Sequence, residues 1–592
     1  MNQRARRGRV SRRGRERHVK VRLLLVIAVG ISAVVMGTLS AQAVMARAQC
    51  NNHPLVLNVA VSDDIAPAIQ RVGQLFNKQN HVAAGRCVEV QVTPEEPAAV
   101  ASVVDGQSSG GGLPSFDAWI PDSSLWVDVA RTFAIGAQRV QPTGITVARS
   151  PVMLVMPPAA AAQVSAYNNS VGWNFLLPTA VGGPTSTQQV RLNLPDPTQS
   201  AVGLAALVEI KRLLGTGAAA RASLTDFVFS AQSSNQFDDP VSLAAFNSLA
   251  APPLDSHPVT VTTEQAVLGY DAAHPSQPLA ARYPSAGTDA SQLGDPEMDY
   301  PYVITSTQSA DQQAATEFGK ALQQSYTAGL VRYYGFRSAN GVTGTIPASY
   351  GLAQQPLQFA SPATPGEAQT ALQTWRKLQI GSRDLAVMDV SSSMSTSVGV
   401  GDLNLEDILT KTALLGLELF PDSAQMGIWE FANDLGGSQP YKQLVPVGPL
   451  PGELGLISRR EQIEQVDQSL HPLASAPAAL NKTILAAYQQ MVAGYQPNYT
   501  NAVILLTAGV DNAPGDMPTA VLVNKLKHLF SVKKPVELII LMLGGKGNFT
   551  ALSQIARAGG GQAYLVTDPT QVGKVFFEAV SRRICLTNEC TP

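Results

Sequence analysis

The sequence contains few of the residues on which catalysis and nucleic-acid binding usually depend. Only 15% of its 592 residues are charged, and its seven histidines are scattered along the chain. No His-Glu-x-x-His motif occurs, and no nucleophile lies at a recognisable spacing from a base. These absences argue against an enzyme. The 45% hydrophobic residues, 48 glycines and 40 prolines instead indicate a globular, loop-rich protein of two or three domains.

Charge is distributed unevenly along the chain. Residues 1–22 contain nine arginines and one lysine against a single acid, Glu16, which gives +9 and leaves −11 for the remainder of a chain whose total is −2. The apolar run 23–39 (LLLVIAVGISAVVMGTL) follows directly and continues, less apolar, to Met45. This order predicts a membrane segment over 23–45 with a basic tail in the cytoplasm, and no nucleic-acid partner.

Two interpretations of the membrane segment stay open. A cleaved export signal fits the small residues of Ala41-Gln-Ala43 and Ala46-Arg-Ala48. A single-pass anchor fits the length, because a helix needs about 20 apolar residues to span a bilayer. We favour the anchor, since 17 strongly apolar residues are long for the core of a signal. Both interpretations place everything after residue 50 outside the cytoplasm, so we expect a cell-membrane protein with extracytoplasmic domains.

Cysteine is scarce, and none of the four cysteines forms a Cys-x-x-Cys pair of the kind that binds metals. In an exported protein, disulfides are the simpler expectation. We expect Cys50 to pair with Cys87 and Cys585 with Cys590, although four cysteines allow three sets of pairings.

Strands alternate with helices over residues 50–355, which predicts an α/β domain with a largely parallel sheet. The strands 55–61 and 116–120 are each followed by Ser and Asp residues that open a helix. Further strands are expected at 88–92, 151–156, 258–262 and 301–305, and helices at 65–76, 200–214, 240–250 and 311–329.

This order of elements resembles the two-lobed periplasmic-type solute-binding proteins, in a form found in actinobacterial surface proteins. The resemblance covers most of residues 55–337 and is carried by VAVSDDIAPAIQRVGQLFN, PSFDAWIPDSSLWVDVA, SPVMLVMPPAA, and RYPSAGTDAS with DYPYVIT. It implies a cleft for a small molecule at the carboxyl ends of the strands, where helix N-termini point. Each candidate could instead be a helix cap. The candidate cleft residues are Ser62, Asp63, Asp122, Ser123, Ser124, Thr198, Ser200 and Thr263.

The second domain, residues 381–592, follows a linker over 356–380 and opens on the most informative stretch of the chain. The apolar strand 385–388 runs into Asp389-x-Ser391-x-Ser393. Side chains of an extended segment alternate sides, so Asp389, Ser391 and Ser393 can converge on one point. One carboxylate and two hydroxyls suit Mg²⁺ or Mn²⁺. The cation would keep open positions for a carboxylate from a protein partner.

This stretch resembles the metal-ion-dependent adhesion site of von Willebrand factor type A domains, and the resemblance covers nearly all of residues 381–584. Thr483 lies where the family places its metal-site threonine, so the implied metal ligands are Asp389, Ser391, Ser393 and Thr483. The continuous apolar strands 502–507 and 535–543 fit the doubly wound, Rossmann-like fold of the family.

The chain departs from the family pattern at one position. Where the family has Thr-Asp-Gly, this sequence has Thr507-Ala508-Gly509. Loss of a group that supports a metal commonly costs about 10–100-fold in affinity, so Ala508 predicts a weakened site. Asp511 could bend back and take the missing place. The alternative is that the loop is a helix cap that binds no ion.

Two functions stay open at this point. The first is a membrane-anchored extracytoplasmic binding protein, not an enzyme, whose type A domain recognises a carboxylate of a protein partner through a divalent cation. The alternative is a solute receptor of a transport system that uses the two-lobed domain. A tight small-molecule ligand would favour the alternative.

Overall fold

The computed structural model describes residues 53–582 apart from 107–114, 165–170, 178–189, 235–256, 285–295, 356, 358, 360–361, 380, 399–402, 434, 436–438 and 546. The predicted membrane segment 23–45, the predicted helix 240–250, and Cys50, Cys585 and Cys590 lie outside the described residues. Among the residues that are described, no helix has both the length and the apolar character to cross a membrane. Cys87 is disulfide-bonded, and its pairing with Cys50 stays a prediction.

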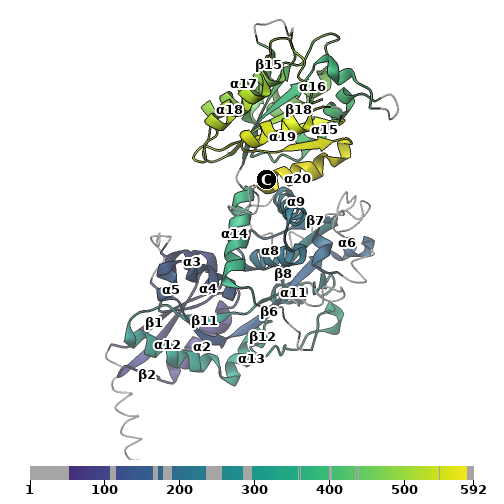
Figure 1. Ribbon diagram of the computed structural model, residues 1–592. Coiled ribbons are helices and arrows are strands. Elements are labelled where there is room, and N and C mark those ends of the chain that lie inside the picture. Colours follow the sequence, from purple (N-terminus) through teal and green to yellow (C-terminus); the bar gives the residue numbers. More distant parts are fainter. Residues whose placement is uncertain are drawn as a thin grey trace, which may run out of the picture. The chain divides into compact units, whose positions relative to one another are not determined.

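The chain divides into two compact units, each made of segments that are distant in sequence. The first unit comprises Met1–Pro151, Thr263–Ala272 and Glu297–Phe359, and the second comprises Val152–Thr262, Ala273–Pro296 and Ala360–Pro592. In the first unit, early elements (purple) and later ones (teal) lie side by side in Figure 1. The predicted two-lobed domain therefore contributes to both units.

The first unit is built on a sheet with the strand order β2-β3-β1-β4-β11-β5. β1 (Leu55–Val61) pairs in parallel with β3 (Arg86–Pro94) and β4 (Ala118–Ile120). β11 (Pro301–Ile304) instead runs antiparallel to both β4 and β5 (Gln141–Thr146). The expectation of a largely parallel sheet is therefore wrong at this edge, because β11 joins the sheet from a distant part of the chain and periodicity does not encode strand direction. β2 spans Val82–Ala83, and the helices are α2 (Ala66–Lys78), α3 (Pro97–Val104), α4 (Ser124–Arg131), α5 (Ala134–Arg139), α12 (Ser309–Leu322) and α13 (Ser325–Tyr333).

The single helix expected over 311–329 is two helices, α12 and α13. Gln324 adopts an extended conformation, with φ −73° and ψ 154°, which ends the helical path. The buried hydroxyl of Thr327 donates to the carbonyl of Ala321 at 2.8 Å, so the first turn of α13 binds the last turn of α12. The apolar spacing continues across the break, which is why the sequence pattern did not locate it.

A second sheet has the strand order β10-β6-β8-β7, with β9 and β12 also paired to β6. β7 and β8 are parallel, while β9, β10 and β12 run antiparallel to β6. Helix α14, which occupies most of the predicted linker, is tied to α8 by a 3.0 Å ion pair between Glu367 and Arg212. The bounds are β6 (Ala148–Met156), β7 (Val190–Asn193), β8 (His257–Thr263), β9 (Ala280–Arg282), β10 (Glu297–Met298), β12 (Arg337–Ser338), α6 (Pro158–Gln163), α8 (Ala201–Leu214), α9 (Ala218–Ser234), α11 (Glu264–Ala273) and α14 (Pro365–Gln379).

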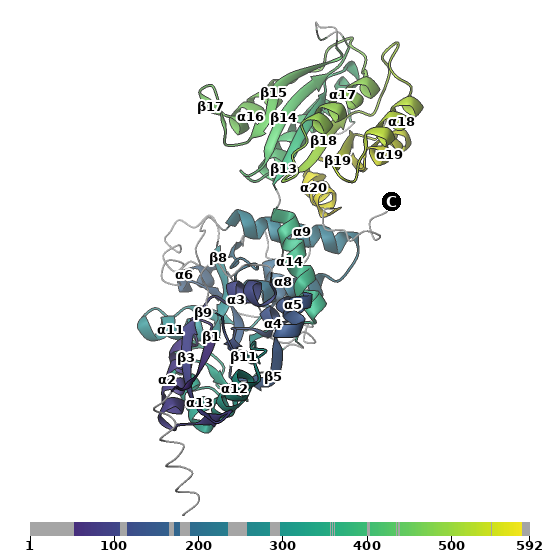
Figure 2. The same cartoon turned by 90° about the vertical axis from the view of Figure 1, so that its left-hand side faces the viewer.

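The C-terminal domain has a sheet with the order β15-β14-β13-β18-β19-β20, and Figure 2 shows β15, β14, β13, β18 and β19 side by side. Numbered from β13, the order is 3-2-1-4-5-6, that of a doubly wound α/β fold. Only β15 is antiparallel among these pairs. The predicted Rossmann-like fold is thus observed. The strands are β13 (Ser382–Asp389), β14 (Gln425–Phe431), β15 (Tyr441–Pro449), β18 (Thr500–Thr507), β19 (Val536–Leu543) and β20 (Ala563–Val566), beside a small hairpin of β16 (Glu453–Leu454) and β17 (Ile457–Ser458).

Helices cover both faces of this sheet and form two separate hydrophobic cores. One core includes Ile408, Ile463 and Val575, from α15, α16 and α20. The other includes Ile484 and Leu522, from α17 and α18, together with residues of α19. The central strands are apolar throughout because both of their faces are covered. The bounds are α15 (Leu405–Glu418), α16 (Arg459–Ser469), α17 (Leu480–Ala493), α18 (Thr519–Leu529), α19 (Phe549–Ala558) and α20 (Val572–Ser581).

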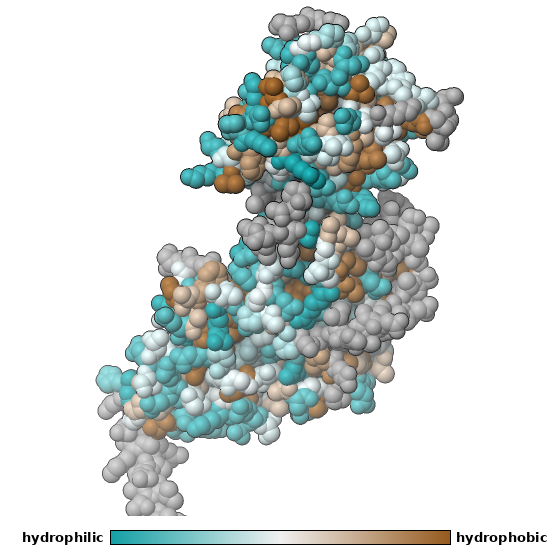
Figure 3. Space-filling model, viewed as in Figure 1, coloured by the Kyte–Doolittle hydropathy of each residue, from teal (hydrophilic) through white to brown (hydrophobic). Residues whose placement is uncertain are grey.

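The surface mixes polar and apolar residues. Figure 3 shows hydrophobic residues in small groups among hydrophilic ones on the visible face. Exposed apolar side chains include Leu456 and Val532. Scattered residues of this kind are common on protein surfaces and by themselves indicate no interface.

One buried ion pair holds the first unit together. Arg337 of β12 binds Glu264 of α11 at 2.8 Å, and their side chains are 0% and 1% exposed. The same guanidinium donates to the carbonyls of Gly341, Ala353 and Gln355. Arg337 therefore fastens the segment after β12 to the start of α11.

We predict that Arg337→Met destabilises the protein by about 3–5 kcal/mol, because it leaves the Glu264 carboxylate buried without its partner. The matched control is Lys320→Met, which removes the 2.6 Å ion pair between Lys320 and Glu317, whose side chains are 63% and 31% exposed. This substitution should cost less than about 1 kcal/mol. Urea unfolding measures both, and equal losses would contradict the assignment.

Candidate functional site

The candidate metal site lies at the point of the C-terminal sheet where the strand order reverses. β13 pairs with β14 on one side and with β18 on the other, and the helices that follow go to opposite faces. Crevices that bind ligands in doubly wound folds open at the carboxyl ends of the strands at this point. Asp389 ends β13 and Thr507 ends β18, so the predicted residue stands at the expected place.

Asp389 is held in place by several hydrogen bonds. Its carboxylate accepts the backbone N–H of Ser391 at 2.9 Å on one oxygen. Its other oxygen accepts the hydroxyl of Thr507 at 2.6 Å and the N–H of Ala508 at 3.3 Å. Asp389 is only 2% exposed, and burial raises its pKa although these donors oppose the rise. The carboxylate is thus fixed in orientation before any ligand arrives.

The two predicted serines converge, but not through the alternation expected of an extended segment, because Ser393 lies in a 3-10 helix over Ser392–Ser395. The hydroxyls of Ser391 and Ser393 are 2.6 Å apart, and Ser391 is 1% exposed. Thr483 is fully buried in α17, and its hydroxyl donates to the carbonyl of Ala479 at 2.8 Å. Each hydroxyl oxygen keeps lone pairs that can face a cation.

Asp511 makes contacts away from Asp389. Its carboxyl accepts the side-chain N–H of Asn481 at 2.7 Å, at the start of α17. Burial, together with a hydrogen bond to and repulsion from Asp516, raises the pKa of Asp511 to about 7. Asp516 in turn accepts the backbone N–H groups of Asn481, Lys482 and Met517. The carboxyl pair therefore caps α17, so its contacts give no support to Asp511 as a replacement for the carboxylate lost at position 508.

The donor set fits a hard divalent cation held by hydroxyls and one carboxylate, as oxygen donors suit Mg²⁺ and Mn²⁺. Within the described residues, no group of three or more His, Cys, Asp or Glu side chains could hold a metal. Among the predicted ligands, Asp389 alone carries a charge, and the weakening expected from Ala508 stays a prediction.

The first unit gathers acidic side chains at the ends of β1 and β4. Ser62 follows β1, and its N–H donates to the carbonyl of Ile120, the last residue of β4. Its hydroxyl donates to Asp64 at 2.7 Å, and the hydroxyl of Tyr300 donates to the same carboxyl. Tyr300 is fully buried and has a φ of 40°, which is unusual for a residue with a side chain. Asp63, another predicted cleft residue, is exposed.

Two further carboxyls belong to this cluster. The backbone carbonyl of Asp122 accepts the N–H of Tyr300, and Asp299 accepts the N–H of Ser124 at 2.7 Å. Burial raises the pKa of Asp64 and Asp299, and burial together with repulsion from Asp64 raises that of Asp122 well above its ordinary value. In the described part of the chain, the buried Oδ1 of Asp122 has no hydrogen-bond partner.

Several predicted cleft residues are helix caps. Ser123 accepts the N–H of Leu125 at the start of α4, and Ser200 accepts that of Gly203 at the start of α8. Thr263 accepts the N–H of Ala266 in α11, and Thr198 binds the carboxylate of Asp196. Their geometry is that of ordinary capping. The structure thus brings together Ser62, Asp122 and Ser124, while Thr198 and Ser200 belong to the second unit.

Sequence reasoning missed Asp64, Asp299, Tyr300 and Thr507. Asp64 directly follows the predicted residues Ser62 and Asp63, so the sequence pattern located the right segment but not the right acid. Asp299 and Tyr300 reach the cluster through the antiparallel strand β11, whose place in the sheet no local pattern indicates. Thr507 could have been found from its position at the end of the strand next to Asp389.

We predict a pH-dependent effect of Asp511→Asn. Because the folded protein holds a proton on Asp511 up to about pH 7, stability from this group is greatest near pH 4 and falls as the pH rises to 7. Asp511→Asn removes that loss, so at pH 8 its melting temperature should exceed that of the wild type by roughly 1–3 °C, after allowance for solvent screening. At pH 4 the two should agree. Asp516→Asn, which weakens the cap of α17, should lower the melting temperature at pH 8, and the opposite order would contradict the assignment.

Comparisons with known proteins found one matching family and relatives that match most of the chain. Residues 57–337 match the family described as bacterial extracellular solute-binding protein. An uncharacterized protein of Mycobacterium tuberculosis, found in strains CDC 1551 and H37Rv, is 23% identical over 571 residues, which cover 91% of this chain and 79% of that protein.

Solved structures include likenesses to both domains. A von Willebrand factor type A protein from Catenulispora acidiphila shares 17% identity, with a TM-score of 0.26, over 34% of this chain and 43% of that one. Iron-bound HitA from Pseudomonas aeruginosa shares 12% identity, with a TM-score of 0.38, over 55% of this chain and 100% of that one. The sulfate-binding protein SubI of Mycobacterium tuberculosis shares 18% identity, with a TM-score of 0.32, over 50% of this chain and 90% of that one.

The family match covers most of the predicted two-lobed domain, which is thus similar to bacterial extracellular solute-binding proteins. The C-terminal sheet has the strand order expected of the second domain. The chain thus contains a solute-binding-protein-like region and a doubly wound domain, which we call the type A-like domain after the resemblance in its sequence.

Proposed function

We propose that this protein is an extracytoplasmic solute receptor whose first unit binds a small, positively charged solute. The observation that carries the proposal is the buried Oδ1 of Asp122, which has no hydrogen-bond partner among the described residues. A buried acceptor without a donor costs free energy, and a ligand that supplies an N–H recovers it.

The charges of the cluster favour a cation. Asp64, Asp122 and Asp299 all have raised pKa values because burial disfavours their ionised forms. Repulsion from Asp64 and Glu96 adds to the rise at Asp122. A bound cation stabilises the ionised carboxylates, whereas an anion would meet further repulsion. The match to solute-binding proteins supports a small molecule as the cation that binds here.

The cluster is held rigidly, as a binding site requires. Tyr300 keeps an unusual positive φ while its hydroxyl binds Asp64 and its N–H binds Asp122. Backbone strain of this kind persists where the surroundings fix it and is concentrated at functional sites. Asp64 and Asp122 are therefore tied to each other through one residue, and a ligand meets carboxyls that are already positioned.

We predict that Asp122→Asn weakens the binding of a cationic solute by about 30-fold or more, which corresponds to about 2 kcal/mol for loss of a desolvated charge partner. The probes are arginine, ornithine, putrescine and spermidine, with sulfate and citrate as anionic counterparts. Thermal shift and calorimetry on the full chain measure the binding of each probe. Binding of the cations should weaken from pH 8 to pH 5, because the carboxyls take up protons.

The control is Asp63→Asn, which removes an exposed carboxylate next to the cluster and should leave binding within about twofold. Stabilisation of the wild type by the anions alone, or equal binding by Asp122→Asn and the wild type, would exclude a cationic solute.

A second function is favoured by the convergence of Ser391 and Ser393 beside Asp389. Here the type A domain binds Mg²⁺ or Mn²⁺ through Asp389, Ser391, Ser393 and Thr483, and the cation engages a carboxylate of a protein partner. When bound, the metal supplies a positive charge with open positions. Residues 23–45 would hold both domains at the outer face of the membrane as a single-pass anchor.

We predict that Mg²⁺ or Mn²⁺ raises the melting temperature of the wild type and that Asp389→Ala abolishes this rise. Ser392→Ala, which alters the serine between the two ligand serines, is the matched control and should keep the response. Ala508→Asp should tighten metal binding by about 10-fold or more, because it restores a supporting carboxylate. An unchanged response in Asp389→Ala would refute this site.

A further inference from the structure

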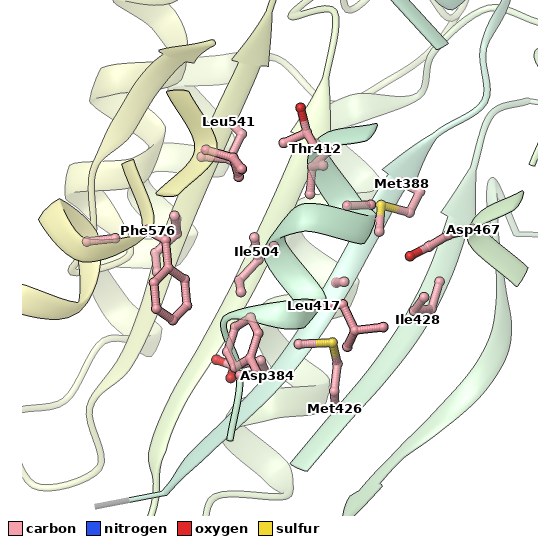
Figure 4. Close-up of a pocket in the computed structure, with 18 of the residues that line it drawn as sticks. Asp384, Met388, Thr412, Leu417, Met426, Ile428, Asp467, Ile504, Leu541 and Phe576 are labelled. Carbon is pink, nitrogen blue, oxygen red and sulfur yellow. The ribbon is translucent and has the colours of Figure 1, made fainter. Parts of the chain in front are cut away.

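The type A-like domain contains a cavity of about 80 Å³ between its sheet and the helices α15, α16 and α20 (Figure 4). Its lining is apolar except for the side chains of Asp384, Thr412 and Asp467. An apolar cavity of about 150 Å³ holds benzene. This cavity therefore has room for roughly three or four non-hydrogen atoms.

The cavity reaches the middle of the sheet. Ile504 and Ile539 lie in the central strands β18 and β19, and Phe576 lies on α20. All three line the cavity and are only partly buried. Central strands of a doubly wound sheet are normally covered on both faces. The helix layer is thus packed less closely against the sheet here.

Two polar atoms of the cavity lack partners within the described residues. Asp467 and Thr412 are each 1% exposed, and in the part of the chain that the structure describes neither Asp467 Oδ1 nor Thr412 Oγ1 has a hydrogen-bond partner. Figure 4 shows the carboxyl of Asp467 directed toward Met388 and Ile428. Burial, with a smaller contribution from Glu464, raises the pKa of Asp467 to about 7. This carboxyl is therefore both buried and able to ionise near neutral pH.

Asp467 occupies a position that packing would give to an apolar residue. On α16, Ile463, Val466 and Leu470 recur at the spacing of one helix face, and Asp467 belongs to the same face. Ile463 and Leu470 are part of the hydrophobic core, and Val466 packs against it. A leucine at position 467 would fill space and leave no polar atom unpaired, so packing does not account for the carboxyl.

We infer that this cavity is a second ligand site, which binds a short alkylamine with its chain against the apolar lining and its ammonium group on the carboxyl of Asp467. The unpaired Oδ1 of Asp467 belongs to an acidic group, so a cation is favoured over an alcohol or a carboxylate of the same size. Trapped water fits less well, because each water needs two to four polar partners and most of the lining offers none.

The test uses n-propylamine on the full chain, with n-propanol and acetate as neutral and anionic molecules that also have four non-hydrogen atoms. Thermal shift and ligand-observed NMR at pH 7.5 should detect propylamine binding at least tenfold tighter than propanol, and no binding of acetate. Asp467→Asn should weaken propylamine binding at least tenfold and make it similar to propanol. Asp467→Leu should fill the cavity and abolish binding of both while keeping the protein folded.

Two control variants distinguish this site from others. Glu464→Gln, which changes a neighbouring carboxyl that does not line the cavity, should bind propylamine as the wild type does. Asp122→Asn should do the same, because it alters only the acidic cluster of the first unit. Failure of propylamine to bind the wild type, equal binding of propylamine and propanol, or equal binding by Asp467→Asn and the wild type would each overturn the inference.

Discussion

The pairing of neighbouring parallel strands is the constraint on which both candidate sites depend. In the type A-like domain, the register that pairs Leu385 with Val503 and Met388 with Leu506 brings Asp389 and Thr507 to the same edge. A shift of one residue would turn Asp389 to the other face of the sheet, because side chains alternate along a strand. The apolar cores on both faces prevent that shift, since it would move Leu385 and Val387 out of one core and into the other, which is packed around Ala386 and Met388. Site geometry is therefore a consequence of core packing.

The same rule operates in the first unit, with a different outcome. β1 and β4 are parallel neighbours, so the residues after Val61 and Ile120 meet at one edge. The antiparallel strand β11 then brings Asp299 and Tyr300 to that edge from its amino end. A carboxyl end of one strand and an amino end of an antiparallel neighbour lie together, so the edge collects side chains from three distant segments. In both units, neighbouring strand ends bring polar side chains together. The result is a group of hydroxyls in the type A-like domain and a cluster of carboxyls in the first unit.

The buried carboxyls that serve the fold have hydrogen-bonding or charged partners, and those we assign to ligand binding keep an oxygen without one in the described part of the chain. Glu264 is 1% exposed, and Arg337 compensates its charge at 2.8 Å. Burial raises the pKa of both Asp122 and Asp467, and the oxygens in question lack a hydrogen bond within the described residues. Isolated buried charges are costly and normally become neutral or paired. A fold that compensates one buried acid so completely, and leaves one oxygen of each of two others without a donor within the described residues, has positions at which an incoming cation is stabilising.

Much of the architecture followed from local pattern, and the exceptions have identifiable physical causes. The doubly wound domain, Asp389 with its two serines, and the position of Thr483 in α17 were predictable, because apolar strands and an alternating polar motif are local features. The direction of β11 and the break between α12 and α13 were not, since both depend on contacts between distant segments. Asp467 was visible in the sequence as an acid on the apolar face of α16, but its lack of a partner could be learned only from the packing around it.

The contacts of Asp511 decide how the two proposed functions rank. If Asp511 lay beside Asp389, a cation at the candidate metal site would meet two carboxylates, as in the family pattern that Ala508 breaks. Asp511 instead accepts from Asn481 at the start of α17, and burial together with the neighbouring Asp516 raises its pKa. The site formed by Asp389, Ser391 and Ser393 therefore offers one carboxylate, and that carboxylate already accepts three hydrogen bonds. In the first unit, Asp122 keeps an oxygen without a donor and lies among further acids. The electrostatic attraction for a cation is therefore greater in the solute-binding-protein-like unit, which is why we place the principal ligand there.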